Sequence, residues 1–163
     1  MTQKYDIKNF VNDLEVRIFP DAVLRECSDE IYSFDNDLKE FAHHMFSFMI
    51  AHNGIGLAAP QIGLLRRIIT VDLEKIEKVL INPVILSYSK EKDNEIEECL
   101  SIPDQLYDVN RDYSVEISAK NINGKNLHFE IKGLAARVLQ HEIDHLDGCL
   151  ICDKGTKVEN YQS

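Results

Sequence analysis

Long apolar runs are missing from this sequence of 163 residues: no stretch of about 18 apolar residues occurs, which argues against a membrane-spanning helix. Internal repeats, low-complexity segments and interdomain linkers are missing too, so we expect one domain over residues 1–163. The N-terminus has no signal-peptide core, and we therefore expect a cytoplasmic protein. In that reducing compartment the four cysteines are expected to be thiols or metal ligands rather than disulfides.

Positive charge is also scarce. The chain has 18 Lys and Arg residues against 28 Asp and Glu residues, a net charge of -10. This balance argues against a direct nucleic-acid site or an anionic membrane as the main partner. The acidic residues are scattered, and 44% of the residues are hydrophobic, which predicts a folded core rather than disorder.

Hydrophobic periodicity predicts helices towards both ends of the chain and strands between them. A helix is expected over 35–52, capped by Asp35 or Asn36 and ended by Asn53-Gly54, and another over 134–146. Strands are expected over 67–73, 79–86, 113–121 and 127–132, with a hairpin turn at Asn123-Gly124 between the last two. Short connections between the strands predict an α+β protein with antiparallel sheet rather than a βαβ series.

Residues 140–148, QHEIDHLDG, have the pattern of a helical metal site. Positions i and i+4 share a helix face, so His141 and His145 can bind one ion. Glu142 can reach a water on that ion without being a ligand, which is the logic of the H-E-x-x-H motif. Two exposed polar residues are the alternative, but this helix is apolar around much of its circumference, and buried imidazoles need partners.

The residues alone leave the third ligand open. Cys149 would align with the two histidines if the helix continued, but Gly148 is expected to end it. Glu159 lies in a polar tail, with only 18 residues following His145. Cys99, in EECLSIP, is the upstream candidate, because a thiolate with two imidazoles suits Zn²⁺ or Fe²⁺. A buried cysteine is otherwise more often a core residue.

Residues 54–63, GIGLAAPQIG, are rich in glycine. A dinucleotide fingerprint would follow a strand and open a helix, whereas this stretch follows a predicted helix and contains Pro60 and Gly63. We instead expect a loop that lines a cavity, where glycine lets a peptide ligand approach the backbone. Gln61 would then offer a neutral amide donor to a developing oxyanion.

The three stretches GIGLAAPQIG, EECLS and QHEIDHLDG resemble, in this order and spacing, the three motifs of the peptide deformylases. The segments FPDAVLR, RRIITVD and LINPVI agree as well, and the resemblance covers roughly residues 16–153. It implies a peptide deformylase-like fold, with antiparallel sheets around a central metal-binding helix. It also implies a hydrolase that removes the formyl group from the N-terminal formyl-methionine of nascent chains.

The resemblance further implies a role for each motif residue. One Fe²⁺ per chain, replaceable by Zn²⁺ or another divalent ion, would be held by Cys99, His141 and His145. Three groups would act on the formyl group: Glu142 as general base, the Gln61 side chain as oxyanion donor, and the Leu100 backbone N–H as second donor. Four residues would lie beside the substrate: Gly56, Ile55, Val138 and Glu98.

Two residues depart from the family pattern. Glu98 stands where the second motif has glycine, and Leu106 stands where many bacterial members carry arginine. Glu98 is the main reason for an alternative function, a weakly active or non-catalytic protein that binds metal and peptide N-termini. Intact Glu142 and Gln61 favour the enzyme, and a zincin-type peptidase is a third candidate. No long basic C-terminal helix follows the motifs, so we expect at most transient contact with the ribosome.

Overall fold

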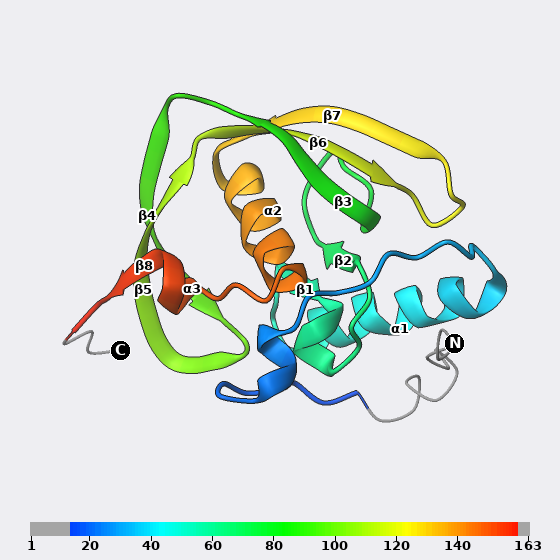
Figure 1. The fold of residues 1–163 in the computed structure, drawn as a ribbon, viewed down its shortest axis with the longest axis horizontal. Helices are drawn as coiled ribbons and strands as arrows, with labels where there is room; N and C mark the ends of the chain where they lie inside the picture. Colours follow the sequence, from blue (N-terminus) through cyan, green and yellow to red (C-terminus); the bar gives the residue numbers. More distant parts are fainter. Residues whose placement is uncertain (1–13, 160–163) are drawn as a thin grey trace.

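Two antiparallel sheets enclose one helix in the structure, a computed structural model that describes residues 14–159. Figure 1 shows this helix, α2 (Gly133–Leu146), between the sheets, while α1 (Asn36–Ala51) packs on the side of the larger sheet. The arrangement confirms the predicted α+β class with antiparallel sheets around a central helix. The predicted single domain covers residues outside the described range as well and stays a prediction.

The larger sheet has five strands in the order β1-β2-β3-β6-β7. Their bounds are β1 (Gly56–Ala58), β2 (Ile68–Val71), β3 (Val79–Tyr88), β6 (Ser114–Lys120) and β7 (Asn126–Lys132). Strands β2, β3, β6 and β7 confirm the four strands predicted from the sequence. The predicted hairpin joins β6 to β7, and Gly124 in its turn has φ 79°, a conformation that favours glycine.

The smaller sheet was not predicted. Its strands are β4 (Lys92–Cys99), β5 (Ile102–Asp112) and β8 (Gly155–Lys157), in that order. Strand β4 has few apolar residues, and only Glu97 and Cys99 in it are buried. It forms nonetheless because it pairs with β5 along almost its whole length. Cross-strand pairing of this kind is a tertiary effect, which a hydrophobic pattern does not report.

The glycine-rich stretch 54–63, expected as a loop, also contains regular structure. It holds β1 and the short 3₁₀ helix η3 (Ala59–Ile62). Gly63, with φ 86°, ends this turn, so the expected helix-breaking role of Gly63 is correct while the loop assignment is wrong. Two further short helices are η2 (Ala22–Arg25) and α3 (Ile151–Lys154).

Helix α1 begins and ends as its sequence predicts. The Asp35 side chain caps it by accepting a hydrogen bond from the Leu38 N–H at 3.0 Å. Its buried side chains recur at helical spacing and include Phe41, Met45 and Met49. They pack against β1, η3 and the strands beside them, which fixes the position of the segment that leads to Gln61.

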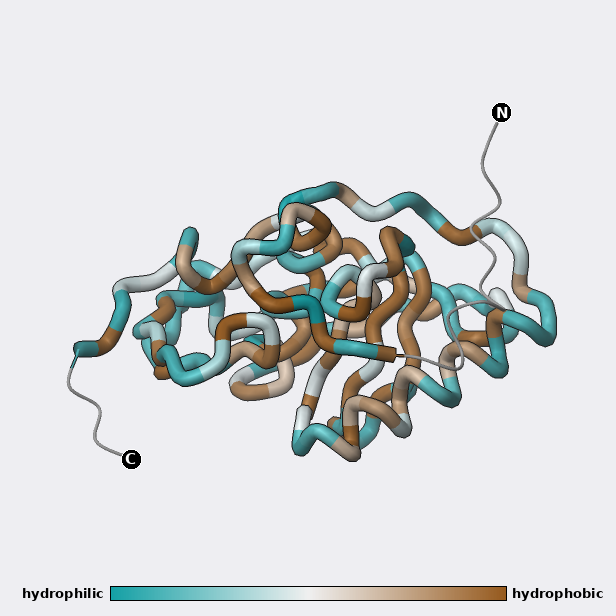
Figure 2. Tube along the Cα trace, turned by 90° about the horizontal axis from the view of Figure 1, so that it is seen from below, coloured by the Kyte–Doolittle hydropathy of each residue, from teal (hydrophilic) through white to brown (hydrophobic). Residues whose placement is uncertain are grey.

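Helix α2 is buried on nearly all sides. Its apolar residues, including Leu139 and Ile143, pack against the five-stranded sheet, where the apolar segments in the middle of Figure 2 gather. Its polar residues face the smaller sheet. The helix ends at Leu146, and Gly148 follows with φ 72°, so close to Arg25 that a Cβ there would lie 2.5 Å from the Arg25 carbonyl oxygen. The predicted stop at Gly148 is therefore confirmed.

Across residues 14–159, no helix is both long enough and apolar enough to cross a membrane.

Candidate metal centre

A cleft of about 1180 Å³ lies between the edge strand β1 of one sheet and the edge strand β4 of the other. Helix α2 forms its floor. The resemblance gave a role to ten residues, and nine of these line the cleft: Ile55, Gly56, Gln61, Glu98, Cys99, Leu100, Val138, His141 and Glu142. The tenth, His145, lies beneath its floor and is 1% exposed.

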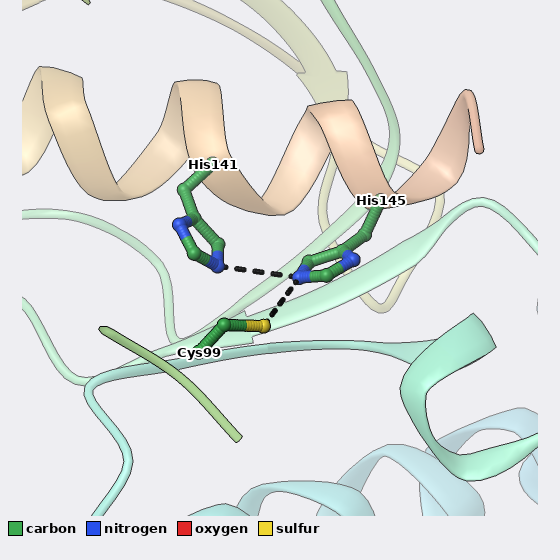
Figure 3. A group of neighbouring side chains, drawn as sticks. All are labelled: Cys99, His141 and His145. Carbon is green, nitrogen blue, oxygen red and sulfur yellow. Dashed lines mark hydrogen bonds between the residues drawn. The ribbon is translucent and has the colours of Figure 1, made fainter. Parts of the chain in front are cut away.

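Three side chains converge at the base of the cleft, as Figure 3 shows. His141 and His145 come from successive turns of α2, and Cys99 comes from the end of β4. The two Nε2 atoms lie 3.2 Å apart, and Cys99 Sγ lies 3.3 Å from His145 Nε2. All three potential ligand atoms lie within 4.8 Å of one another. Within residues 14–159 this is the one group of three or more such side chains that could hold a metal ion.

The spacing of these atoms fits a small metal ion. Metal–nitrogen bonds of about 2.0–2.1 Å and metal–sulfur bonds of about 2.3 Å place neighbouring ligand atoms of a tetrahedron roughly 3.3–3.6 Å apart. The observed 3.2 and 3.3 Å are close to these separations. The residues present therefore fit a divalent cation with three protein ligands, which leaves one position open.

The charges around the two histidines favour a cation as well. Burial and the charge of His141 hold the pKa of His145 well below 6.5, in the neutral form that binds metals. Burial also lowers the pKa of His141, but its contacts with Cys99 and Glu97 outweigh burial and raise the pKa to about 10. The surroundings thus favour a positive charge at the point where the three ligand atoms meet.

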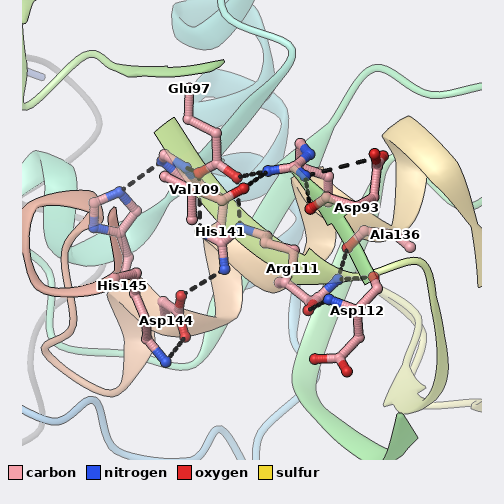
Figure 4. Close-up of polar contacts among 12 residues, drawn as sticks. Asp93, Glu97, Val109, Arg111, Asp112, Ala136, His141, Asp144 and His145 are labelled. Carbon is pink, nitrogen blue, oxygen red and sulfur yellow. Dashed lines mark hydrogen bonds and ion pairs between the residues drawn. The ribbon is translucent and has the colours of Figure 1, made fainter. Parts of the chain in front are cut away.

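Glu97 fixes the orientation of His141. The His141 Nδ1–H donates to Glu97 Oε2 at 2.9 Å, which leaves Nε2 free to face the cluster. Arg111 binds the same carboxylate with two hydrogen bonds, of 2.5 and 2.9 Å, and Arg137 adds a third of 2.7 Å. Arg111 also reaches Asp144 of α2 at 2.8 Å, and Figure 4 shows the network joining the helix to the smaller sheet.

The charged groups of this network are buried. The side chains of Glu97 and Arg111 are each only 5% exposed. Burial alone would raise the pKa of Glu97, but the hydrogen bonds and charges of His141 and Arg111 lower it to about 2. Glu97 is therefore an anion across the physiological pH range. Sequence patterns missed Glu97, Arg111 and Arg137, although the position of Glu97 two residues before Cys99 places both on one face of a strand.

Glu142 lines the cleft next to His141 in the sequence. Its side chain is buried, and Oε2 has no hydrogen-bond partner among the described residues. Burial raises its pKa to about 7, against the opposing charges of His141 and Arg111. A carboxyl group with these properties can both accept and return a proton near neutral pH.

Contacts of both the oxygen and the nitrogen of its side-chain amide fix the orientation of Gln61. Its Oε1 accepts from the Ala58 N–H at 2.9 Å, so its NH₂ group must face the cluster. That NH₂ group lies 3.6 Å from Cys99 Sγ and 3.3 Å from Ser101 Oγ. The short helix η3 places Gln61 at the back of the cleft, where the side chain is 2% exposed.

The other candidates are not members of the cluster. Leu100 follows Cys99 on the wall of the cleft, buried Val138 lies one turn before the metal-binding part of α2, and Ile55 is exposed at the mouth. Cys149 follows the end of α2 and is not part of the three-residue cluster, and Glu159 is exposed on the rim. The structure thus favours Cys99 over both as the partner of the two histidines.

Comparison with known proteins agrees with this geometry. Residues 14–161 match the family model described as Polypeptide deformylase. The chain is 43% identical to a peptide deformylase of Thermodesulfovibrio yellowstonii over 146 residues, covering 86% of this chain and 88% of that protein. It is 45% identical to a Buchnera aphidicola peptide deformylase over 138 residues, covering 83% and 93%.

A solved structure shows the same fold. The crystal structure of peptide deformylase from Thermotoga maritima superimposes with a TM-score of 0.85 at 36% identity, covering 88% of this chain and 97% of that one. The family is metal-dependent, in agreement with the Cys99, His141 and His145 cluster. The family match, the related sequences and the shared fold establish that the chain belongs to the polypeptide deformylase family of enzymes.

Proposed function

We propose that this enzyme hydrolyses the formyl amide of the N-terminal formyl-methionine of newly synthesised polypeptides, releasing formate and a free amine. The observation that carries the proposal is the meeting, in one cleft, of a Cys-His-His cluster with the carboxylate of Glu142, whose Oε2 has no hydrogen-bond partner within residues 14–159. A purely structural metal site would need neither an open cleft nor a free carboxylate beside it. Family membership supports the same chemistry.

Cys99, His141 and His145 would hold the metal, which we propose to be Fe²⁺, with Zn²⁺ or another divalent ion able to replace it. When bound, such a cation supplies a Lewis acid that makes water more acidic and polarises a carbonyl group. Thiolate and imidazole ligands suit both of these metals. Glu97 would keep the imidazole of His141 turned towards the ion by accepting its Nδ1–H.

Glu142 would act as the general base and then as the general acid. Its carboxylate would take a proton from the attacking water and return it to the nitrogen of the leaving amine, so that the C–N bond breaks and formate departs. The side-chain amide of Gln61 and the backbone N–H of Leu100 would donate to the oxyanion of the tetrahedral intermediate. One such donor typically stabilises the transition state by about 2.7–4 kcal/mol.

The peptide would bind as an added strand. Strands β1 and β4 both lie at the edges of their sheets and border the cleft, so both have backbone groups free to pair with an extended chain. Gly56 on β1 would allow close approach, with Ile55 beside it at the mouth of the cleft. The methionine side chain would enter the interior along Val138.

A direct assay tests the proposed function. The protein is purified without oxygen, its bound metal is measured, and formate release from formyl-Met-Ala-Ser is followed, with acetyl-Met-Ala-Ser as the control substrate. We expect stoichiometric metal and formate from the formyl peptide alone. Metal-loaded protein that binds the peptide but releases no formate would support the non-catalytic alternative, and cleavage of an internal peptide bond would indicate a peptidase.

We also propose that the enzyme acts in the cytoplasm on chains that emerge from the ribosome, with at most transient ribosome contact. The net charge of -10 argues against a direct nucleic-acid site. Cosedimentation with ribosomes at low and physiological salt tests this proposal, which predicts little bound protein at either concentration.

A further inference from the structure

Glu98 is an exposed carboxylate on the wall of the cleft. It lies on β4 between two inward-facing residues, Glu97 and Cys99, so strand alternation turns its side chain to the opposite, outer face. Ile96 shares that outer face and is 49% exposed. The edge of β4 that would pair with a peptide therefore presents an anionic and an apolar side chain next to each other.

The residues paired with this face of β4 carry no positive charge. Ile96 is paired with Asp108 on β5, which in turn is paired with Thr156 on β8, and Leu106 lies two residues before Asp108. None of these neighbours is positively charged, and within residues 14–159 no ion pair involves Glu98. Lys157, a cation of the same sheet that lines the cleft, is paired with Tyr107 and so belongs to the inner face.

We propose that Glu98 selects substrates whose side chain after formyl-methionine is cationic, and disfavours acidic ones. The proposal rests on the proposed deformylase function and specifies its substrate class. A peptide strand paired with β4 places its outward side chains about 4.5–5.5 Å, Cβ to Cβ, from those of β4. At that range a positive side chain attracts the Glu98 carboxylate and a negative one repels it.

Lysine and arginine also fit the apolar part of this surface. Their long stems can cover apolar side chains while the charged end stays in water. Here the stem would lie on Ile96 or Leu106, and the ammonium or guanidinium group would reach Glu98. A short neutral residue would gain neither contact.

Alternation predicts which substrate positions respond. With the formyl-methionine side chain directed inward along Val138, the second residue points outward to the face of Glu98 and the third points inward again. Charge selection should therefore appear at position two and be nearly absent at position three. A general electrostatic attraction of cationic peptides to an acidic protein would instead act at both positions.

The test compares kcat/KM for formyl-Met-Lys-Ser and formyl-Met-Glu-Ser, and for formyl-Met-Ala-Lys and formyl-Met-Ala-Glu, with equal metal loading. We expect a Lys-to-Glu ratio of about three to ten at position two, which decreases with salt, and a ratio close to one at position three. Glu98→Gln should bring the first ratio towards one, and Glu98→Lys should invert it. Glu95→Gln is the matched control, because Glu95 is an exposed carboxylate of the same strand that does not line the cleft.

A ratio near one at position two, or a ratio that survives Glu98→Gln, would overturn the proposal. If no formyl peptide releases formate, the proposed deformylase function itself is wrong, which is a separate result. The charge preference can then still be tested by fluorescence anisotropy, which measures the binding of fluorescent Met-Lys-Ser and Met-Glu-Ser to the metal-loaded protein. Equal affinities that do not change in Glu98→Gln would then reject it.

Discussion

Gly56 lies directly against the carboxyl group of Glu142. A Cβ built on Gly56 would lie 2.8 Å from Glu142 Cδ and 2.9 Å from Glu142 Cγ. Real Cβ atoms do not approach other atoms so closely, so any side chain at this position must displace the glutamate. The glycine of the first motif therefore makes room for the proposed base as well as for the substrate.

Gly56→Ala should lower kcat by about 10²-fold while metal content stays normal, because a proton-transfer group displaced by about an ångström loses its alignment with the reacting atoms. The measurement is kcat and KM with formyl-Met-Ala-Ser, together with metal analysis. Gly54→Ala is the control, since a Cβ at Gly54 would meet Met49 Cγ at 3.1 Å and the carbonyl oxygens of Met49 and Gly56 at 3.3 and 3.4 Å, and not Glu142. Activity of Gly56→Ala within twofold of the wild type would show that the carboxylate of Glu142 can move without loss.

Glu142→Ala should fold and bind metal but lose about 10²–10⁴-fold in kcat, the usual cost of removing a positioned acid or base. Glu142 is placed beside the cluster, and its Oε2 has no partner within the described residues, so the loss breaks no hydrogen bond that supports the fold. Near-normal turnover, with metal content verified, would rule out the assigned mechanism.

Cys99→Ala should lose most of its bound metal, whereas Cys149→Ala should keep it. Cys99 lies 3.3 Å from His145 Nε2, while Cys149 follows the end of α2, and burial raises the pKa of its thiol, which disfavours the thiolate needed for ligation. Metal content after dialysis, measured for both variants, checks this prediction. The reverse outcome would move the metal to the end of the helix.

Helices α1 and α2, four strands and the pair His141 and His145 could be predicted because each has a local signal, whereas Cys99 was assigned through the resemblance, since the residues alone left the third ligand open. Apolar periodicity identifies α1 and α2, and the i, i+4 spacing places His141 and His145 on one face. Strands β4 and β5 have no such signal, since their inner face is partly ionic. The contact of Glu97 with His141 joins residues 44 positions apart, a pairing that arises only when the sheet packs on the helix.

The cap of α1 offers a stability test that is independent of the active site. The hydrogen bond from the Leu38 N–H, assisted by Ser33, lowers the pKa of Asp35 below its usual 3.8. Because the pKa is lower in the folded state, this contribution is present above the unfolded pKa and is lost as the pH falls through the folded value.

Asp35→Ala should therefore lower the free energy of unfolding by about 1 kcal/mol at pH 7, and the difference from wild type should shrink below about pH 4. Asp35→Asn is the matched control, since asparagine caps equally well and does not titrate. Urea unfolding at pH 7, 5 and 3.5 provides the measurement. A difference that stays constant with pH would mean that the charge of Asp35 has no part in the cap.

Glu97→Gln isolates the role of the network that orients His141. The substitution keeps the size of the side chain but replaces the carboxylate, the shared acceptor for His141, Arg111 and Arg137, by an amide with one acceptor oxygen. Loss of a partner that orients a metal ligand typically weakens metal binding by about 10–100-fold. Two buried arginines would also lose one of their counter-charges, although Asp144 stays 2.8 Å from Arg111, so the free energy of unfolding should fall by up to about 3–5 kcal/mol, the cost of a broken buried pair.

The two effects can be separated. Competition with a chelator gives metal affinity under conditions where the variant is folded, as judged by circular dichroism, and urea unfolding of the metal-free protein gives stability alone. Glu116→Gln is the control, because Glu116 also binds a histidine, His128, at 2.7 Å, but on the exposed face of the larger sheet. Exposed pairs contribute about 0–1 kcal/mol, so this variant should keep both metal affinity and stability. If Glu97→Gln binds metal as tightly as the wild type while losing stability, Glu97 supports the fold alone, and the orientation of His141 must come from the packing of α2.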